Sequence, residues 1–125
     1  MYLNDWPQKY ESVVHILKQT HLTLAPWNVS HVAETRNGLD PVFYHFHGLR
    51  FVSPKNVRLY TGYRINEQAQ QLYDRYLEQL RASVEILKAT GIPIKPIPLE
   101  QGIKPKLIRL IQKCRGLDAF VTIDH

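Results

Sequence analysis

The densest group of chemically versatile side chains lies at residues 44–50, where the sequence reads Tyr-His-Phe-His-Gly-Leu-Arg. The imidazoles of His45 and His47 can ligate a divalent metal when neutral. The glycine at position 48 lets backbone approach a phosphate closely, and Arg50 can pair with phosphate oxygens through two parallel hydrogen bonds. Two histidines do not complete a metal site, because a divalent ion would need further oxygen ligands. A histidine pair hydrogen-bonded at a sheet edge is the alternative interpretation.

Two tryptophans form the second group, each beside polar side chains. Trp6 follows Asn4 and Asp5, and Trp27 precedes Asn28. A tryptophan ring presents a large apolar face together with one hydrogen-bond donor, which suits stacking against a sugar. Packing of both rings in a core or an interface is the alternative, because large aromatic side chains are highly buried on average.

A basic helix at residues 105–115 is the third group. Lys106, Arg109 and Lys113 recur at helical spacing, and leucines and isoleucines fill the other side. This pattern is typical of a helix that lies on an anionic membrane surface, although a solvated face over a small core fits it as well. Nucleic acid is a less favoured partner, because no nucleic-acid-binding module is recognisable around the helix.

The elements that must position these groups differ in how clearly the sequence specifies them. Residues 66–90 carry apolar side chains at steps of three and four, so they predict a long amphipathic helix that Gly91 can end. The alternating prolines of residues 92–98 predict an extended spacer.

The segments before this helix are shorter. Residues 12–17 predict a buried strand, or else a continued helix from position 7, and residues 20–28 predict a strand or extended loop ending near Trp27. Residues 42–48 predict a strand with both histidines on one side and Tyr44 and Phe46 on the other. Residues 49–65 predict a looping connection.

Composition limits the class of protein. The chain has 125 residues, a net charge of +5, 44% hydrophobic residues and one cysteine, Cys114. These values exclude a disordered or collagen-like chain, and the lone cysteine allows no internal disulfide. No apolar run approaches the roughly 20 residues that span a bilayer. We therefore expect a cytoplasmic location, with a peripheral position at the inner membrane face as an alternative.

Three blocks of the sequence, residues 2–7, 24–28 and 44–50, together resemble the C-terminal half of bacterial nucleotide-sugar glycosyltransferases. These enzymes are relatives of the galactosyltransferase and glycogenin-like group, which has a Rossmann-like GT-A catalytic domain. The order and spacing of the blocks match over residues 1–63. This resemblance implies that residues 1–63 belong to that catalytic domain and that residues 64–125 form a helical C-terminal extension. The expected fold class is α+β, with a few short strands, a long helix and a second, basic helix.

The resemblance also implies roles for matched residues. His45 would join an Asp-x-Asp pair on Mn²⁺, Gly48 would let its loop reach the donor diphosphate, and Arg50 would add positive charge there. The remaining site residues would bind substrate, the nucleotide-sugar donor or the glycan acceptor: Asn4, Asp5, Trp27, Asn28 and His47.

The sequence lacks other parts of such an enzyme, namely an Asp-x-Asp pair and a β-α-β unit for the nucleotide. We therefore expect a C-terminal piece of a longer polysaccharide-synthesising transferase, in which Mn²⁺ acts only in the complete enzyme. The isolated chain should not transfer sugar. A carbohydrate- or protein-binding module without catalysis, and a basic protein that associates with membranes or nucleic acid, are the alternatives.

Overall fold

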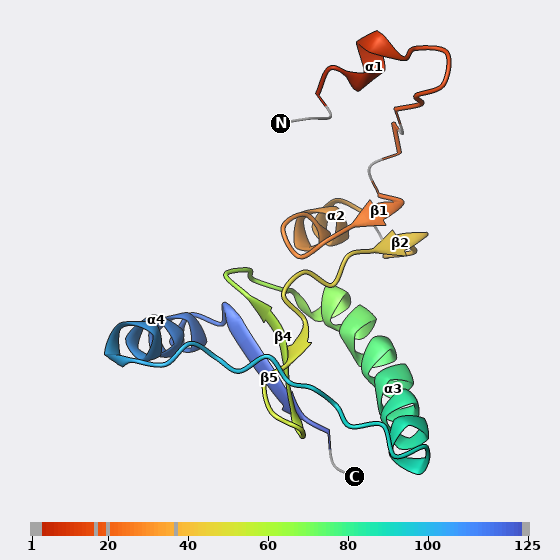
Figure 1. Ribbon diagram of the computed structural model, residues 1–125. Coiled ribbons are helices and arrows are strands. Elements are labelled where there is room, and N and C mark those ends of the chain that lie inside the picture. The colour runs from red at the N-terminus through yellow and green to blue at the C-terminus, as the bar shows by residue number, and fades with distance from the viewer. Residues whose placement is uncertain (1–3, 17, 20, 37, 124–125) are drawn as a thin grey trace.

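The protein combines helices and small sheets in an α+β fold, as predicted. The computed structural model describes residues 4–16, 18–19, 21–36 and 38–123. The elements along the chain are α1 (Trp6–Lys9), β1 (Thr23–Leu24), α2 (Val29–Thr35), β2 (Phe43–Tyr44), β3 (Arg50–Phe51), β4 (Asn56–Thr61), α3 (Glu67–Ala89), α4 (Ile103–Cys114) and β5 (Asp118–Thr122). Figure 1 labels all of them except β3.

The strands form two separate sheets. β1 and β2 pair in parallel, whereas β3, β4 and β5 form an antiparallel sheet with β4 in the centre. The prediction of a looping connection over residues 49–65 is therefore wrong, because this range contains β3 and β4. Arg58 interrupts the apolar pattern of β4, and the strand is nevertheless buried from Val57 to Tyr60.

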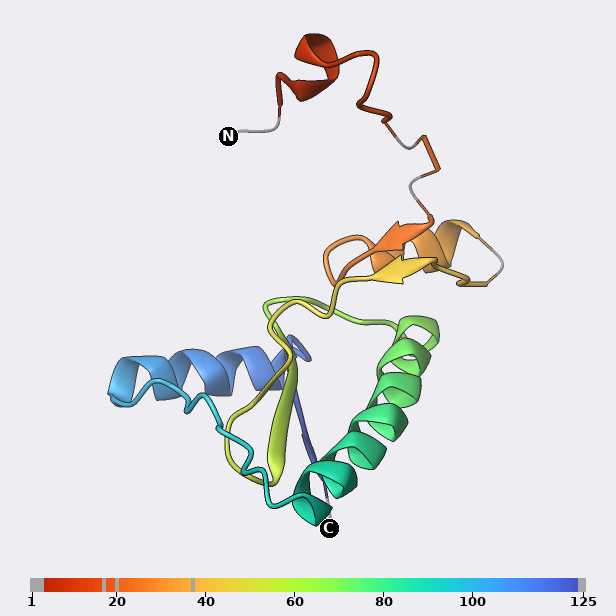
Figure 2. The ribbon, with the colours of Figure 1, turned by 45° about the vertical axis from the view of Figure 1, so that its right-hand side comes forward.

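The predicted strand over residues 12–17 is also wrong within the described residues. Residues 10–13 form a turn, in which the amides of Val13 and Val14 donate to the carbonyl of Tyr10 at 3.0 and 2.8 Å. Val13 and Ile16 are exposed, so this apolar run does not reach a core, and residue 17 lies outside the described residues. The segment around α1 stands apart from the rest of the fold (Figure 2).

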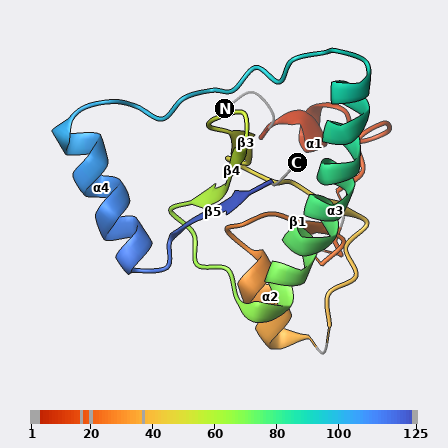
Figure 3. The ribbon, with the colours of Figure 1, turned by 90° about the horizontal axis from the view of Figure 1, so that it is seen from below.

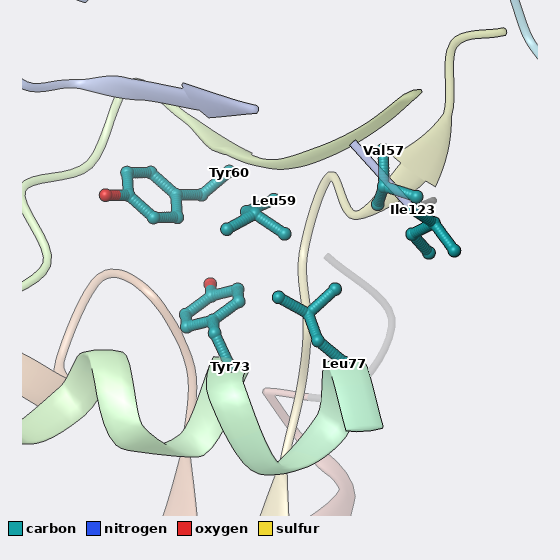
Figure 4. Packing of buried hydrophobic residues seen from close by; sticks show 6 residues of the cluster. All are labelled: Val57, Leu59, Tyr60, Tyr73, Leu77 and Ile123. Carbon is teal, nitrogen blue, oxygen red and sulfur yellow. The ribbon is translucent and has the colours of Figure 1, made fainter. Parts of the chain in front are cut away.

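The main core lies between α3 and the three-stranded sheet. Tyr73 and Leu77 of α3 pack against Val57 and Leu59 of β4 and against Ile123, which follows β5 (Figure 4). A core built mainly by the long helix on apolar strands is thus confirmed. The cluster draws on both sides of position 63, and the division into domains there stays a prediction.

The long helix begins and ends close to the predicted positions. The side chain of Asn66 accepts a hydrogen bond from the amide of Ala69 at 3.0 Å, which satisfies one of the free donors of the first turn. Gly91 follows the helix with φ of 70°, a conformation that favours glycine.

The second helix lies across the sheet from α3 (Figures 1 and 3). The predicted spacer, residues 92–98, lies within a connector over residues 92–101 that has no helix or strand. It hydrogen-bonds to the sheet where the amide of Ile97 donates to the carbonyl of Phe51 at 2.8 Å. The predicted helix over residues 105–115 is present as α4, which has no buried residue.

Candidate functional site

Four aromatic rings from three segments meet on one exposed surface. The ring centroid of Trp27 lies 5.9 Å from that of His45, 5.8 Å from that of His47 and 6.2 Å from that of Tyr63. The two imidazoles are 5.5 Å apart, and His47 is 6.1 Å from Tyr63. Trp27 is 59% exposed and both histidines are exposed. We call these four residues the ring surface.

A turn between β1 and α2 presents Trp27. The side chain of Asn28 accepts a hydrogen bond from the amide of Ala25 at 2.8 Å, which closes the turn around Pro26 and Trp27. Pro26 is buried below this turn, so the tryptophan ring points outward. Asn28, predicted to bind substrate, thus holds the turn that presents Trp27.

The histidines lie at the end of the parallel pair. The predicted strand over residues 42–48 is shorter than expected. β2 ends at Tyr44, because its partner β1 ends at Leu24, where the turn that holds Trp27 begins. The amide of His45 still donates to the carbonyl of Leu24 at 2.8 Å, and the amide of His47 then donates to the carbonyl of His45 at 2.8 Å, so the chain turns at Phe46.

The predicted alternation of side chains continues past the strand. The rings of Tyr44 and Phe46 lie 5.7 and 5.2 Å from the ring of Tyr73 in the core, whereas His45 and His47 are exposed. Core packing of the two alternate rings therefore fixes the outward direction of both imidazoles.

Tyr63 completes the surface, and the sequence alone did not identify it. It follows Gly62, whose φ is 79°, at the end of β4. Its place beside His47 depends on the pairing of β4 in the sheet, so no local spacing pattern indicates it.

The remaining predicted residues lie elsewhere. Asn4 and Asp5 precede α1, where Trp6 contacts Tyr10 at 6.0 Å between ring centroids. Neither tryptophan lies in the core, since Trp6 is 47% exposed and Trp27 is 59% exposed. Gly48 adopts φ of 81° in the turn after His47.

Arg50 lines a cavity between β4 and α4, and none of the four rings of the ring surface borders that cavity. The structure thus brings Trp27, His45 and His47 together, and it places the Arg50 side chain in a separate pocket.

The donor set of the ring surface does not fit a complete manganese site. Two imidazoles contribute nitrogen ligands only, whereas Mn²⁺ prefers oxygen ligands. No group of three or more His, Cys, Asp or Glu side chains in the described part of the chain could hold a metal ion. A resident metal would need carboxylates that these residues do not provide.

Across the described residues, no helix is both long and apolar enough to cross a bilayer. No family model matches the chain, and no solved structure gives a significant match. The chain is similar to the uncharacterized protein YfnD of Bacillus subtilis strain 168, with 27% identity over 97 residues. The match covers 70% of this chain and 31% of YfnD, so the chain spans about a third of the length of that relative.

Proposed function

We propose that this chain is part of a nucleotide-sugar glycosyltransferase with a Rossmann-like GT-A domain. In this proposal the ring surface is where the sugar and the donor diphosphate meet. One observation carries the proposal: Trp27, His45 and His47 come from two separate blocks of the family resemblance, and they converge on one exposed surface.

The chemistry of the ring surface suits a sugar. An exposed indole offers an apolar face to the C–H side of a pyranose, and its N–H can bind a hydroxyl. Each imidazole adds a donor or an acceptor for further hydroxyls. Gly48 follows directly, and backbone without a Cβ there leaves room for phosphate oxygens.

Manganese belongs to the complete enzyme in this proposal. His45 would provide one ligand, and carboxylates from outside the described residues would provide the others. A bound cation stabilises the negative charge that develops on a departing nucleoside diphosphate. The chain alone should not transfer sugar.

Manganese titration of the ¹⁵N-labelled chain tests the metal role of His45. Because the ion is paramagnetic, even weak and transient binding broadens the NMR signals of nearby nuclei. An incomplete site binds a metal ion weakly, so the titration should extend to roughly millimolar Mn²⁺. We expect Mn²⁺ to broaden the amide signals of His45 and His47 selectively. The His45→Ala variant should abolish this effect.

His31 provides the matched control, because it is an exposed histidine on α2 outside the ring surface. His31→Ala should leave the broadening at residues 45–47 unchanged. Equal broadening at His31 and His45 would remove the metal role and with it the chemical basis of the enzymatic proposal.

A carbohydrate-binding module without catalysis is the second candidate, favoured by the exposure of Trp27. In that case simple sugars should shift the Trp27 indole signal in the absence of nucleotide and metal. Trp27→Ala should weaken binding by about tenfold, the loss expected for one stacked ring. Sugar titrations followed by NMR measure both effects.

Trp6→Ala is the control for this test, since Trp6 is a comparably exposed tryptophan outside the ring surface. Sugar binding that survives Trp27→Ala, or that shifts both indoles equally, would show that the ring surface is not a sugar site.

Association of α4 with an anionic membrane stays part of the proposal. Ile103, Leu107 and Leu110 are 88%, 55% and 58% exposed, and the helix carries four basic and no acidic residues. An apolar stripe beside positive charge is the pattern of a helix that lies in a lipid interface.

A further inference from the structure

We propose that the cavity between the three-stranded sheet and α4 binds a phosphate group. The cavity has a volume of about 460 Å³. It lies apart from the ring surface and shares no lining residue with it. We call it the arginine cavity, after Arg50 and Arg58, which line its sheet side.

The two arginines stand directly opposite each other on neighbouring strands. In the antiparallel pairing of β3 with β4, Arg50 is the partner of Arg58, so both side chains leave the same face of the sheet. Like charges in this position repel each other unless anions neutralise them. The cavity therefore needs negative charge on this face.

Asp118 neutralises one of the two arginines. Its carboxylate accepts hydrogen bonds from Nε and Nη2 of Arg58 at 2.7 and 3.0 Å, with both side chains almost fully buried. This two-point contact occupies both carboxylate oxygens. The fold thus supplies one anion for two guanidinium groups.

Arg50 has no such partner among the described residues. Its Nε atom is buried and makes no hydrogen bond with any described residue. A buried donor without an acceptor is unfavourable, because the protein has removed its water without replacing it. Arg50 also lines the cavity, so its guanidinium brings there a charge that no ion pair among the described residues neutralises.

The opposite wall adds further positive charge. Lys104 and Arg109 of α4 border the cavity, and Glu100 is the acidic residue among its lining side chains. Arg109 donates to the backbone carbonyl of Glu100 at 2.9 Å, which leaves the Glu100 carboxylate outside that bond. Cations therefore outnumber acidic groups, even with Arg58 matched by Asp118.

The two walls are tied together by hydrogen bonds. The Thr61 hydroxyl accepts from Arg58 at 2.6 Å and donates to the side-chain carbonyl of Gln112 on α4 at 3.1 Å. This chain of contacts holds α4 over the sheet face. The positive groups are consequently held in place before a ligand arrives, which lowers the entropic cost of binding.

A phosphomonoester fits these features better than a single carboxylate. It carries close to two negative charges at neutral pH and offers three acceptor oxygens, which match several cationic donors around one cavity. Inorganic phosphate would not fill the cavity, so the ligand class is a phosphorylated molecule whose remainder occupies the rest. A soluble phosphate ester and a phospholipid headgroup share this chemistry.

Phosphate titration of the full chain tests the proposal. We expect inorganic phosphate to shift the Nε–H NMR signal of Arg50 and to raise the thermal midpoint. Arg50→Gln should weaken phosphate binding by roughly tenfold or more, as expected for loss of a charge-assisted contact. Glu100→Gln should strengthen binding, because it removes a carboxylate from the cavity wall.

Arg81→Gln is the matched control, since Arg81 is an exposed arginine on α3 outside the cavity. It should leave phosphate affinity unchanged. Arg50→Gln should still fold, because its Nε makes no hydrogen bond in the native state, and circular dichroism checks this. Phosphate binding that is equally strong in Arg50→Gln would overturn the proposal. Absence of phosphate binding to the parent chain would also overturn it, unless binding to the lipid vesicles described next depends on Arg50.

Vesicles of phosphatidylcholine with phosphatidic acid separate the two sources of phosphate. Sedimentation with these vesicles that Arg50→Gln abolishes would support a lipid headgroup, and binding of soluble phosphate alone would support a soluble ester. A third outcome is that Leu107→Gln loses vesicle binding, Arg50→Gln keeps it, and soluble phosphate does not bind. This result would assign the lipid contact to the exposed face of α4 and would reject the cavity as a phosphate site.

Discussion

Replacing Asp118 with alanine should destabilise the protein by about 3–5 kcal/mol, because it leaves the buried guanidinium of Arg58 without its counter-charge. The two side chains join β5 to the centre of the sheet through contacts of 2.7 and 3.0 Å. Their side-chain exposure is 0% for Asp118 and 9% for Arg58, so water cannot replace the lost carboxylate. Urea denaturation of both proteins measures the difference in free energy of unfolding.

A surface ion pair gives the comparison. Lys88 contacts Glu85 at 3.1 Å on α3, with side-chain exposures of 41% and 62%. Lys88→Ala should cost only about 0–1 kcal/mol, because solvent screens exposed pairs. Similar losses for Asp118→Ala and Lys88→Ala would contradict a buried pair. The double variant Arg58→Met with Asp118→Leu should recover much of the loss, since it removes both charges.

Replacing Tyr73 with alanine should cost about 3–5 kcal/mol, the range for deleting a large ring from a packed core. Tyr73 is fully buried, and its ring contacts those of Tyr44, Phe46 and Tyr60 at 5.7, 5.2 and 5.4 Å between centroids. Typical domains are stable by only about 5–15 kcal/mol, so this variant should lie near the threshold of folding. Denaturant unfolding followed by circular dichroism measures the loss.

Tyr10→Ala is the matched control, because Tyr10 is 43% exposed beside α1. Its effect should be within about 0.5 kcal/mol, and a comparable loss in both variants would contradict the packing described for α3. Tyr73→Phe separates the ring from its hydroxyl. It removes the 3.2 Å hydrogen bond that the hydroxyl of Tyr44 donates, at a cost of about 0.5–1.5 kcal/mol.

The hydroxyl of Tyr73 also links stability to pH. Burial raises the pKa of Tyr73, and the neighbouring phenols of Tyr44 and Tyr60 act in the same direction through their charge when ionised. The unfolded chain ionises this phenol near pH 10. The contribution of the raised pKa is therefore fully present below that pH and is lost as the pH rises above it. Tyr73→Phe should show a smaller fall in stability above pH 10.

Local patterns predicted the two longer helices, α3 and α4, because their signals are contained within each segment, whereas the short helix α2 was not predicted. The apolar spacing of residues 67–89, the cap at Asn66 and the glycine at position 91 lie within or beside the helix that they specify. By contrast, the strand prediction for residues 12–17 used an apolar run that has no partner strand in the described part of the chain. A strand is stable only when another segment pairs with it.

The three-stranded sheet could not be read from local patterns. Arg58 in the middle of β4 resembles a loop residue, and its burial is made favourable by the carboxylate of Asp118, 60 positions away. Tyr63 was missed for a similar reason, because it lies 16 positions after His47 and 36 positions after Trp27 in the sequence. The two histidines and Trp27 could be selected by residue type, because alternation at residues 44–47 and the turn at Asn28 are local features.

The position of β4 has a consequence for how the chain is made. As the central strand it pairs with β5, which is synthesised about 60 residues later, since the register partner of Arg58 is Phe120. Until then the nascent chain carries a strand with one open edge, and Val57 and Leu59 are covered only once α3, which is synthesised first, packs against them. Such segments invite pairing with other chains. Biosynthesis thus passes through an interval in which chaperones or rapid docking of α3 must protect this strand.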